Sequence, residues 1–238
     1  MPNRDVTIST LDGGAMPAYI AEPHGSGPWP TAVVLGELFG LTDVQRDAAD
    51  RVASMGYLAV APDLLHRRTA GPLSEDEEGR RVALAIVQQL TRLELMNDVR
   101  DALESVASEP NADAAASPIA VGMSFGGHVA VLAAALLRLP VCVAMYAGWL
   151  AGCEIPASQP EPTGSLELAG RLLLLVGEDD PMIPMSDVDA LRGWHPNAEC
   201  ATYPGVGHRF CSINRPGYDV NAAADAWQRI ASFLGRTG

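Results

Sequence analysis

Residues 117–138 read SPIAVGMSFGGHVAVLAAALLR, and this stretch decides the fold. It begins with an apolar run at 117–121 that is typical of a strand buried on both faces. It continues into an Ala/Leu-rich run at 127–138 that is typical of a helix. Between the two lies Gly122-Met123-Ser124-Phe125-Gly126, which matches the pattern G-x-S-x-G. Because the glycines leave room for a sharp strand-to-helix turn, we expect Ser124 to be an exposed, strained nucleophile at the helix N-terminus.

The sequence on either side of this stretch alternates between strand and helix patterns. Apolar runs predict strands at 31–36, 57–61, 141–146, 171–176 and 199–203. Helical spacing of apolar residues predicts helices at 43–55, 80–90, 95–107 and 221–234. Two short strands at 6–11 and 17–21, joined by Asp12-Gly13-Gly14, predict a hairpin at the start of the chain. The alternation predicts an α/β fold with a mostly parallel central sheet flanked by helices.

Composition and charge narrow the class of protein further. The chain has 238 residues, 48% of them hydrophobic, and no internal repeat, so we expect a single domain over residues 1–238. Its net charge of −13 would repel a phosphate backbone, so nucleic-acid binding is not expected. The sequence has no apolar leader and no apolar run of about 20 residues. These features predict a cytoplasmic protein that does not enter a membrane.

Metal and cofactor signals are weak. The four cysteines, Cys142, Cys153, Cys200 and Cys211, lack the spacing of a metal site and are expected to be free thiols. Neither a glycine-rich phosphate loop nor a cluster of metal ligands is recognisable, so no cofactor is predicted.

A serine nucleophile requires a base, and the base requires an orienting carboxylate. In this kind of fold the chain order is serine, acid, histidine, with the last two following late strands. His208 follows the predicted strand 199–203 and is flanked by glycines, so it is the candidate base. Three consecutive acids at 178–180 follow the predicted strand 171–176, and we favour Asp180 among them.

Acyl transfer also needs N–H donors for a developing oxyanion. The expected donors are Phe125, directly after the nucleophile, and Leu38, in the segment Gly36-Glu37-Leu38-Phe39-Gly40 after an earlier strand. Glu37 is an acid at the same strand end. From the residue alone, Glu37 is either an active-site acid or a solvent-exposed or helix-capping carboxylate.

Five segments together resemble the dienelactone hydrolase (carboxymethylenebutenolidase) family of the α/β-hydrolase superfamily. They are Gly36-Glu37-Leu38-Phe39-Gly40, Gly56-Tyr57-x-x-Val60-x-Pro62-Asp63-Leu64, the Ser124 motif with Gly127, Asp180-x-x-Ile183-Pro184, and Gly207-His208-x-Phe210. The resemblance runs from about residue 31 to residue 233. It implies the α/β-hydrolase fold and a hydrolase that cleaves an ester or lactone through an acyl-enzyme. It also implies that Asp180 orients the base and that Glu37 assists activation of the nucleophile.

The sequence departs from this family in two places. Founding members carry cysteine where Ser124 stands, and a serine with its own base needs less help from Glu37. The family also binds a substrate carboxylate with two arginines, and Arg81 or Arg80 matches the first. Ser212 stands four residues after His208, where the second is expected, so Arg209 or Arg215 is the candidate substitute. We therefore expect a small-molecule ester or lactone other than dienelactone.

Two other functions use the same sequence features. An acyltransferase or a lactone-forming, cyclising enzyme of a biosynthetic pathway would use the same catalytic residues with an alcohol in place of water. A non-catalytic ligand-binding protein on the same fold would lack the triad geometry. The pocket is expected to be lined by Trp149, Leu150 and the loop at 151–165.

Overall fold

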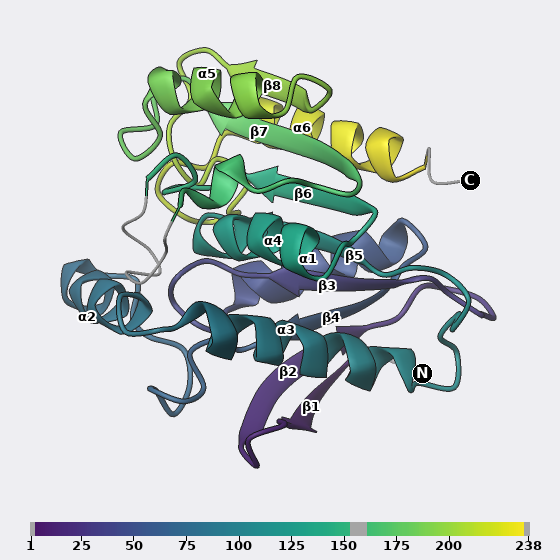
Figure 1. Cartoon of the computed structure of the whole chain (residues 1–238). Coiled ribbons are helices and arrows are strands. Elements are labelled where there is room, and N and C mark those ends of the chain that lie inside the picture. The colour runs from purple at the N-terminus through teal and green to yellow at the C-terminus, as the bar shows by residue number, and fades with distance from the viewer. Residues whose placement is uncertain (1–2, 153–160, 236–238) are drawn as a thin grey trace.

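Eight strands form one continuous sheet in a computed structural model that describes residues 3–152 and 161–235 (Figure 1). The strand order is β1-β2-β4-β3-β5-β6-β7-β8. The strands span β1 Arg4–Ser9, β2 Ala15–Ala21, β3 Thr31–Leu35, β4 Leu58–Pro62, β5 Ile119–Met123, β6 Val141–Met145, β7 Arg171–Gly177 and β8 Glu199–Tyr203. The predicted α/β fold with a mostly parallel sheet is confirmed.

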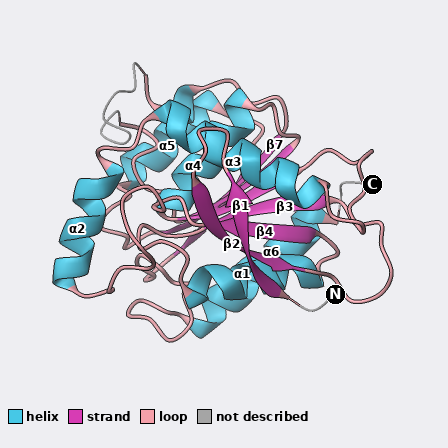
Figure 2. Ribbon diagram, turned by 90° about the horizontal axis from the view of Figure 1, so that it is seen from below, coloured by secondary structure: helices cyan, strands magenta, loops and turns pink. Residues whose placement is uncertain are grey.

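Helices cover both faces of the sheet (Figures 1 and 2). They span α1 Asp43–Ser54, α2 Glu77–Val87, α3 Arg92–Ala107, α4 Phe125–Leu136, α5 Met185–Trp194 and α6 Val220–Leu234, with a short 3-10 helix at Thr163–Ser165. One buried cluster joins the sheet to α3 and α4, and a second joins it to α1 and α6. The sheet therefore lies between two apolar layers, which explains why its central strands are apolar without alternation.

The pairing of the strands determines where polar side chains collect. β1 and β2 form the predicted antiparallel hairpin, whose turn contains Gly13 with a φ of 82°. The six strands from β4 to β8 in sheet order are parallel. The carboxyl ends of parallel strands lie at one edge, so the residues that follow β5, β7 and β8 meet there.

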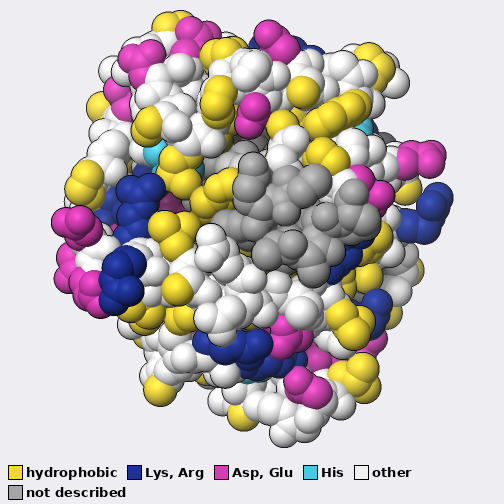
Figure 3. Space-filling model, turned by 60° about the vertical axis from the view of Figure 1, so that its left-hand side comes forward, with side chains coloured by type: hydrophobic (Ala, Val, Ile, Leu, Met, Phe, Trp, Pro, Cys, Tyr) yellow, Lys and Arg dark blue, Asp and Glu magenta, His cyan; other side chains and the backbone are white. Residues whose placement is uncertain are grey.

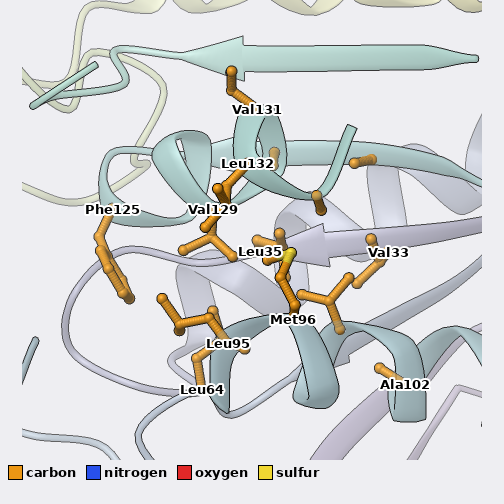
Figure 4. Packing of buried hydrophobic residues seen from close by; sticks show 14 of the residues in the cluster. Val33, Leu35, Leu64, Leu95, Met96, Ala102, Phe125, Val129, Val131 and Leu132 are labelled. Atoms are coloured by element: carbon orange, nitrogen blue, oxygen red, sulfur yellow. The ribbon is translucent and has the colours of Figure 1, made fainter. Parts of the chain in front are cut away.

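The helix that follows Ser124 is anchored in the core. Every residue of β5 is buried, as are ten residues of α4. Figure 4 shows Phe125 and Val129 of α4 on the side that faces Leu35 of β3 and Leu95 of α3, and all four belong to one buried cluster. Burying each such side chain contributes about 1.5–3 kcal/mol. This packing holds the start of α4 in a fixed position relative to the sheet.

The structure corrects several predicted boundaries and adds one helix. β5 begins and ends two residues later than the predicted 117–121, and α4 begins two residues before the predicted 127. α2 begins at Glu77 rather than at residue 80, because the side chain of Asp76 accepts a hydrogen bond from the Gly79 N–H and caps the helix. α5 was not predicted; only Val188 and Leu191 of its ten residues are buried, so its apolar periodicity is weak.

Two further predictions concern thiols and membranes. Cys142, Cys200 and Cys211 are free thiols, and Cys153 lies outside the described residues. Across residues 3–152 and 161–235, none of the helices combines the length and the apolar character that crossing a bilayer requires.

Candidate active site

Ser124 lies in the sharp turn between β5 and α4. Its φ is 54° and its ψ is −119°, a left-handed region that is strained for a residue with a side chain. The Ser124 N–H donates to the carbonyl of Met145 at 2.9 Å, which ties the turn to the end of β6. The expected strained turn is therefore present. The expectation of an exposed residue is wrong, since only 3% of Ser124 is accessible to solvent.

The glycines of the motif are required by close backbone contacts. A Cβ atom on Gly122 would lie 2.1 Å from the carbonyl oxygen of Gly126. One on Gly126 would lie 2.2 Å from the carbonyl oxygen of Leu35, on β3. Both distances are far below van der Waals contact, so only glycine allows the strand, the turn and the helix to approach this closely.

His208 and Asp180 complete a hydrogen-bonded chain with Ser124. The Ser124 Oγ lies 2.9 Å from His208 Nε2. On the other side of the imidazole, Nδ1 lies 2.6 Å from Asp180 Oδ2. Asp180 is buried, and its Oδ1 accepts a hydrogen bond from the Met182 N–H at 2.9 Å. The carboxylate is thus fixed at both oxygens, and it determines which imidazole nitrogen carries the proton that points to it.

The loops that carry these two side chains are held together by backbone contacts. The Glu178 N–H donates to Tyr203 and the Asp179 N–H donates to Val206, each at 3.0 Å. A Cβ atom on Gly177, at the end of β7, would lie 2.3 Å from the carbonyl oxygen of Val206. The loops after β7 and β8 are therefore packed directly on each other, which brings Asp180 to His208.

One expected oxyanion donor directly follows Ser124, and the other lies in the loop after β3, where the carbonyl oxygens of Leu35 and Gly36 closely approach Gly126. Phe125 is the first residue of α4, and Leu38 lies in the loop after β3; both are buried. Neither N–H donates to a backbone carbonyl in the described part of the chain. An N–H group without a backbone acceptor remains available to a tetrahedral oxyanion.

Glu37 is buried at the same edge and is paired rather than solvated. Only 6% of the residue is exposed, so the solvent-exposed alternative is wrong. The Ser212 hydroxyl donates to Glu37 Oε1 at 2.6 Å, and Arg209 Nη2 lies 2.5 Å from Glu37 Oε2. Ser212 thus contacts Glu37 from the position where the family resemblance places an arginine, and Arg209 supplies the positive charge from another position.

Tyr146 lies between His208 and Ser212, the residue that donates to Glu37. The sequence did not indicate a role for Tyr146. Its hydroxyl lies 3.1 Å from the Ser212 Oγ, and its ring contacts the His208 ring edge-on with centroids 5.3 Å apart. Burial, with the nearby Glu37 carboxylate, raises the pKa of Tyr146 well above its ordinary value. The hydroxyl therefore stays protonated. Its position directly after β6 was the available signal, because the residues after parallel strands form the site.

The predicted arginines occupy different environments. Arg81 lies on the exposed side of α2 and pairs with Glu78 at 2.5 Å. Arg80, its neighbour, points the other way and brings Nη2 to 3.6 Å from the sulfur of Met182, which lies two residues after Asp180. Of the two, Arg80 reaches the loop that carries Asp180.

Arg209 and Arg215 share a carboxylate that the sequence did not indicate. Arg209 Nη2 lies 2.5 Å from Glu75, and Arg215 Nε donates to the same oxygen of Glu75 at 2.8 Å. Burial alone would raise the pKa of Glu75, but its hydrogen bonds from Arg215 and Arg209 lower it overall. Glu75 is therefore ionised near neutral pH. Figure 3 brings the left-hand side of Figure 1 forward and shows acidic, basic and hydrophobic side chains gathered together at its left.

Nothing in residues 3–152 and 161–235 brings three or more His, Cys, Asp or Glu side chains into a group that would hold a metal ion. His128, on α4, is fully buried, and burial lowers its pKa to about 4. It is therefore a neutral packing residue that lies 2.9 Å from the Thr163 hydroxyl through Nε2. Of the expected pocket lining, Leu150 is buried and Trp149 is half-buried, while residues 153–160 lie outside the described part.

The strand order, with an antiparallel pair at one edge and a serine turn after β5, is that of an α/β hydrolase. Est1E from Butyrivibrio proteoclasticus shares this fold, with a TM-score of 0.67 at 14% identity and 98% coverage of both chains. The chain belongs to the dienelactone hydrolase family, whose model matches residues 16–238. It is therefore a hydrolase.

Two relatives and one solved structure support the assignment to this family. A protein of Escherichia coli K12 named "Putative carboxymethylenebutenolidase" is 34% identical, over 95% of this chain and 84% of its own. A protein of Azospirillum brasilense with the same name is 31% identical, over 97% of both chains. The crystal structure of a "Putative Dienelactone Hydrolase" from Klebsiella pneumoniae superposes with a TM-score of 0.85 at 28% identity, covering 98% of both chains.

Proposed function

We propose that this hydrolase cleaves a carboxylic ester or lactone through an acyl-enzyme formed on Ser124. The observation that carries the proposal is the unbroken chain from Ser124 Oγ to His208 Nε2, 2.9 Å, and from His208 Nδ1 to Asp180 Oδ2, 2.6 Å. These are the distances at which an imidazole removes the hydroxyl proton while a carboxylate stabilises the imidazolium that results.

In the first half-reaction His208 accepts the Ser124 proton as Oγ attacks the substrate carbonyl carbon. The carbonyl oxygen becomes an oxyanion, which the N–H groups of Leu38 and Phe125 stabilise. The intermediate then collapses, His208 returns the proton to the leaving oxygen, and the ester bond breaks. For a lactone, the leaving alcohol remains attached to the acyl group.

In the second half-reaction water takes the place of the alcohol. His208 removes a proton from water, the hydroxyl attacks the acyl carbon, and collapse returns the proton to Ser124 while the acid departs. Asp180 orients the imidazole in both halves. In this proposal Glu37, anchored by Ser212 and Arg209, is an active-site acid that positions the loop carrying Leu38.

The test is hydrolysis of p-nitrophenyl acetate and p-nitrophenyl butyrate by the wild-type chain near neutral pH. We expect turnover at least ~10³-fold above the uncatalysed rate, since general-base and oxyanion contributions together supply that much. Product analysis in the presence of methanol separates hydrolysis, which yields the free acid, from acyl transfer, which yields the methyl ester. A folded protein that leaves every ester intact would contradict the proposal and favour the non-catalytic alternative.

A further inference from the structure

Five charged side chains beside the triad form a connected group, here called the Arg209 cluster: Glu37, Asp43, Glu75, Arg209 and Arg215. Arg209 Nη2 lies 2.5 Å from both Glu37 Oε2 and Glu75 Oε2. Arg215 pairs with Glu75 through Nε and with Asp43 through Nη2. Glu75 is thus the central member, because both guanidinium groups contact the same one of its oxygens.

The cluster contains more negative than positive charge. Glu37 and Glu75 balance Arg209 and Arg215, and Asp43, whose side chain is 74% exposed, adds one formal negative charge. The side chains of Arg209, Glu37 and Glu75 are 16%, 3% and 19% exposed, so solvent screens these charges only in part. Burial alone would lower the pKa of Arg209, but its pairing with Glu37 and Glu75 raises it overall. Arg209 and Glu75 are therefore both charged near neutral pH.

The cluster lies next to the reacting groups. Arg209 directly follows His208, and Glu37 directly precedes Leu38, whose N–H is a proposed oxyanion donor. Glu37 is also connected to the base through Ser212 and Tyr146, which contacts the His208 ring. An acyl group on Ser124 would therefore experience the charge of this cluster. Two of the guanidinium nitrogens that would attract an anion there, Arg209 Nη2 and Arg215 Nε, already contact Glu37 or Glu75, whereas the buried Arg209 Nε has no hydrogen-bond partner among the described residues.

We propose that Glu75 determines the charge preference of the site. By occupying both Arg209 and Arg215, it makes the enzyme select uncharged acyl groups over acyl groups that carry a carboxylate. The inference rests on the proposed ester hydrolysis and names its substrate class. It also assigns a role to a residue that contacts neither the triad nor an expected oxyanion donor: Glu75 acts by neutralising Arg209 and Arg215.

Arg80 is the cation that opposes this preference. It is exposed on α2, reaches Met182 near the Asp180 loop, and has no carboxylate partner among the described residues. An exposed guanidinium is screened by solvent and salt, so its attraction for a substrate anion is weak. The pairs of Arg209 with Glu37 and Glu75 are partly buried and screened less, so they outweigh Arg80.

The experiment compares kcat/KM for two esters with the same five-carbon acyl chain, p-nitrophenyl pentanoate and mono-p-nitrophenyl glutarate. The wild-type chain is expected to prefer the neutral ester by about tenfold. Glu75→Gln retains an oxygen that can accept from both arginines but removes the charge. We expect it to shift the ratio toward glutarate by about fivefold or more. Glu77→Gln, which removes an exposed charge two residues away, is the matched control and should leave the ratio unchanged.

A second measurement uses the wild-type chain alone and varies the salt concentration. Raising NaCl from roughly 10 to 500 mM shortens the Debye length from about 30 Å to about 4 Å and should raise kcat/KM for the glutarate ester relative to the pentanoate ester. Because the whole chain carries a net charge of −13, salt tests only whether the preference is electrostatic, and Glu75→Ala takes the place of Glu75→Gln if the latter does not fold.

Three results would overturn the inference: a wild-type preference for glutarate, an equal shift in Glu75→Gln and Glu77→Gln, or a glutarate ratio that falls with salt. A glutarate preference that disappears in Arg80→Ala would transfer the role to Arg80. The proposed function fails separately, if neither ester is hydrolysed or if Ser124→Ala hydrolyses them as well as wild type.

Discussion

Ser124→Ala is expected to lower kcat for p-nitrophenyl acetate by about 10⁴-fold or more. The substitution removes only Oγ, the atom that would form the acyl-enzyme, and leaves the oxyanion donors and His208 in place. The residual rate would come from these groups acting on water. Because alanine has no atom that accepts the acyl group, the burst of p-nitrophenol that accompanies acylation should also disappear.

Ser105→Ala, on α3, is the control for this change, since it removes the same atom from a helix at a distance from the triad. It should hydrolyse the ester at the wild-type rate. Far-UV circular dichroism and thermal unfolding of both variants establish that each is folded. If Ser124→Ala retained a tenth or more of wild-type kcat, Ser124 would not be the nucleophile.

Asp180→Asn is expected to lower kcat by about 10³–10⁴-fold with little change in shape. The asparagine oxygen can still accept the Met182 N–H, but its amide then presents N–H groups to His208 Nδ1. The imidazole must respond by placing its proton on Nε2, where it can no longer accept the Ser124 proton. The lower kcat therefore results from the position of the imidazole proton and not from altered packing.

Asp179→Asn is the matched control, because it makes the same change in the adjacent residue. Asp179 is exposed and contributes to the site only through its backbone N–H, which bonds to Val206. We expect near wild-type kcat. An equal loss of kcat in both variants, or a loss in Asp179→Asn alone, would mean that Asp180 is not the residue that orients His208.

The parts of the fold that the sequence predicted are those in which local pattern and packing agree. β5 and β6 are buried on both faces, so their apolar runs are continuous and unmistakable. The serine turn was predictable because a Cβ atom on Gly122 or Gly126 would lie less than 2.5 Å from a backbone oxygen, so both positions require glycine. A strict need for glycine at fixed positions can be recognised in the sequence without knowledge of the rest of the chain.

The parts that the sequence did not predict depend on contacts between distant segments. Glu75 lies in the loop before α2 and meets Arg209 only after the sheet has formed, 134 positions along the chain. Nothing in its neighbourhood distinguishes it from the other acids of that loop. In the sequence, Ser212 stands only where the family resemblance expects an arginine. In the structure its hydroxyl donates to Glu37, 175 positions away.

The most direct test of the central claim is the mass of the protein acid-quenched within the burst phase after mixing with p-nitrophenyl acetate. The chain contains no lysine, so the usual site of nonspecific acetylation is absent apart from the terminal amine. We predict one acetyl group per chain, located by fragmentation on Ser124 and lost as turnover ends. Turnover without any acetylated protein, or an acetyl group on another side chain, would contradict the account.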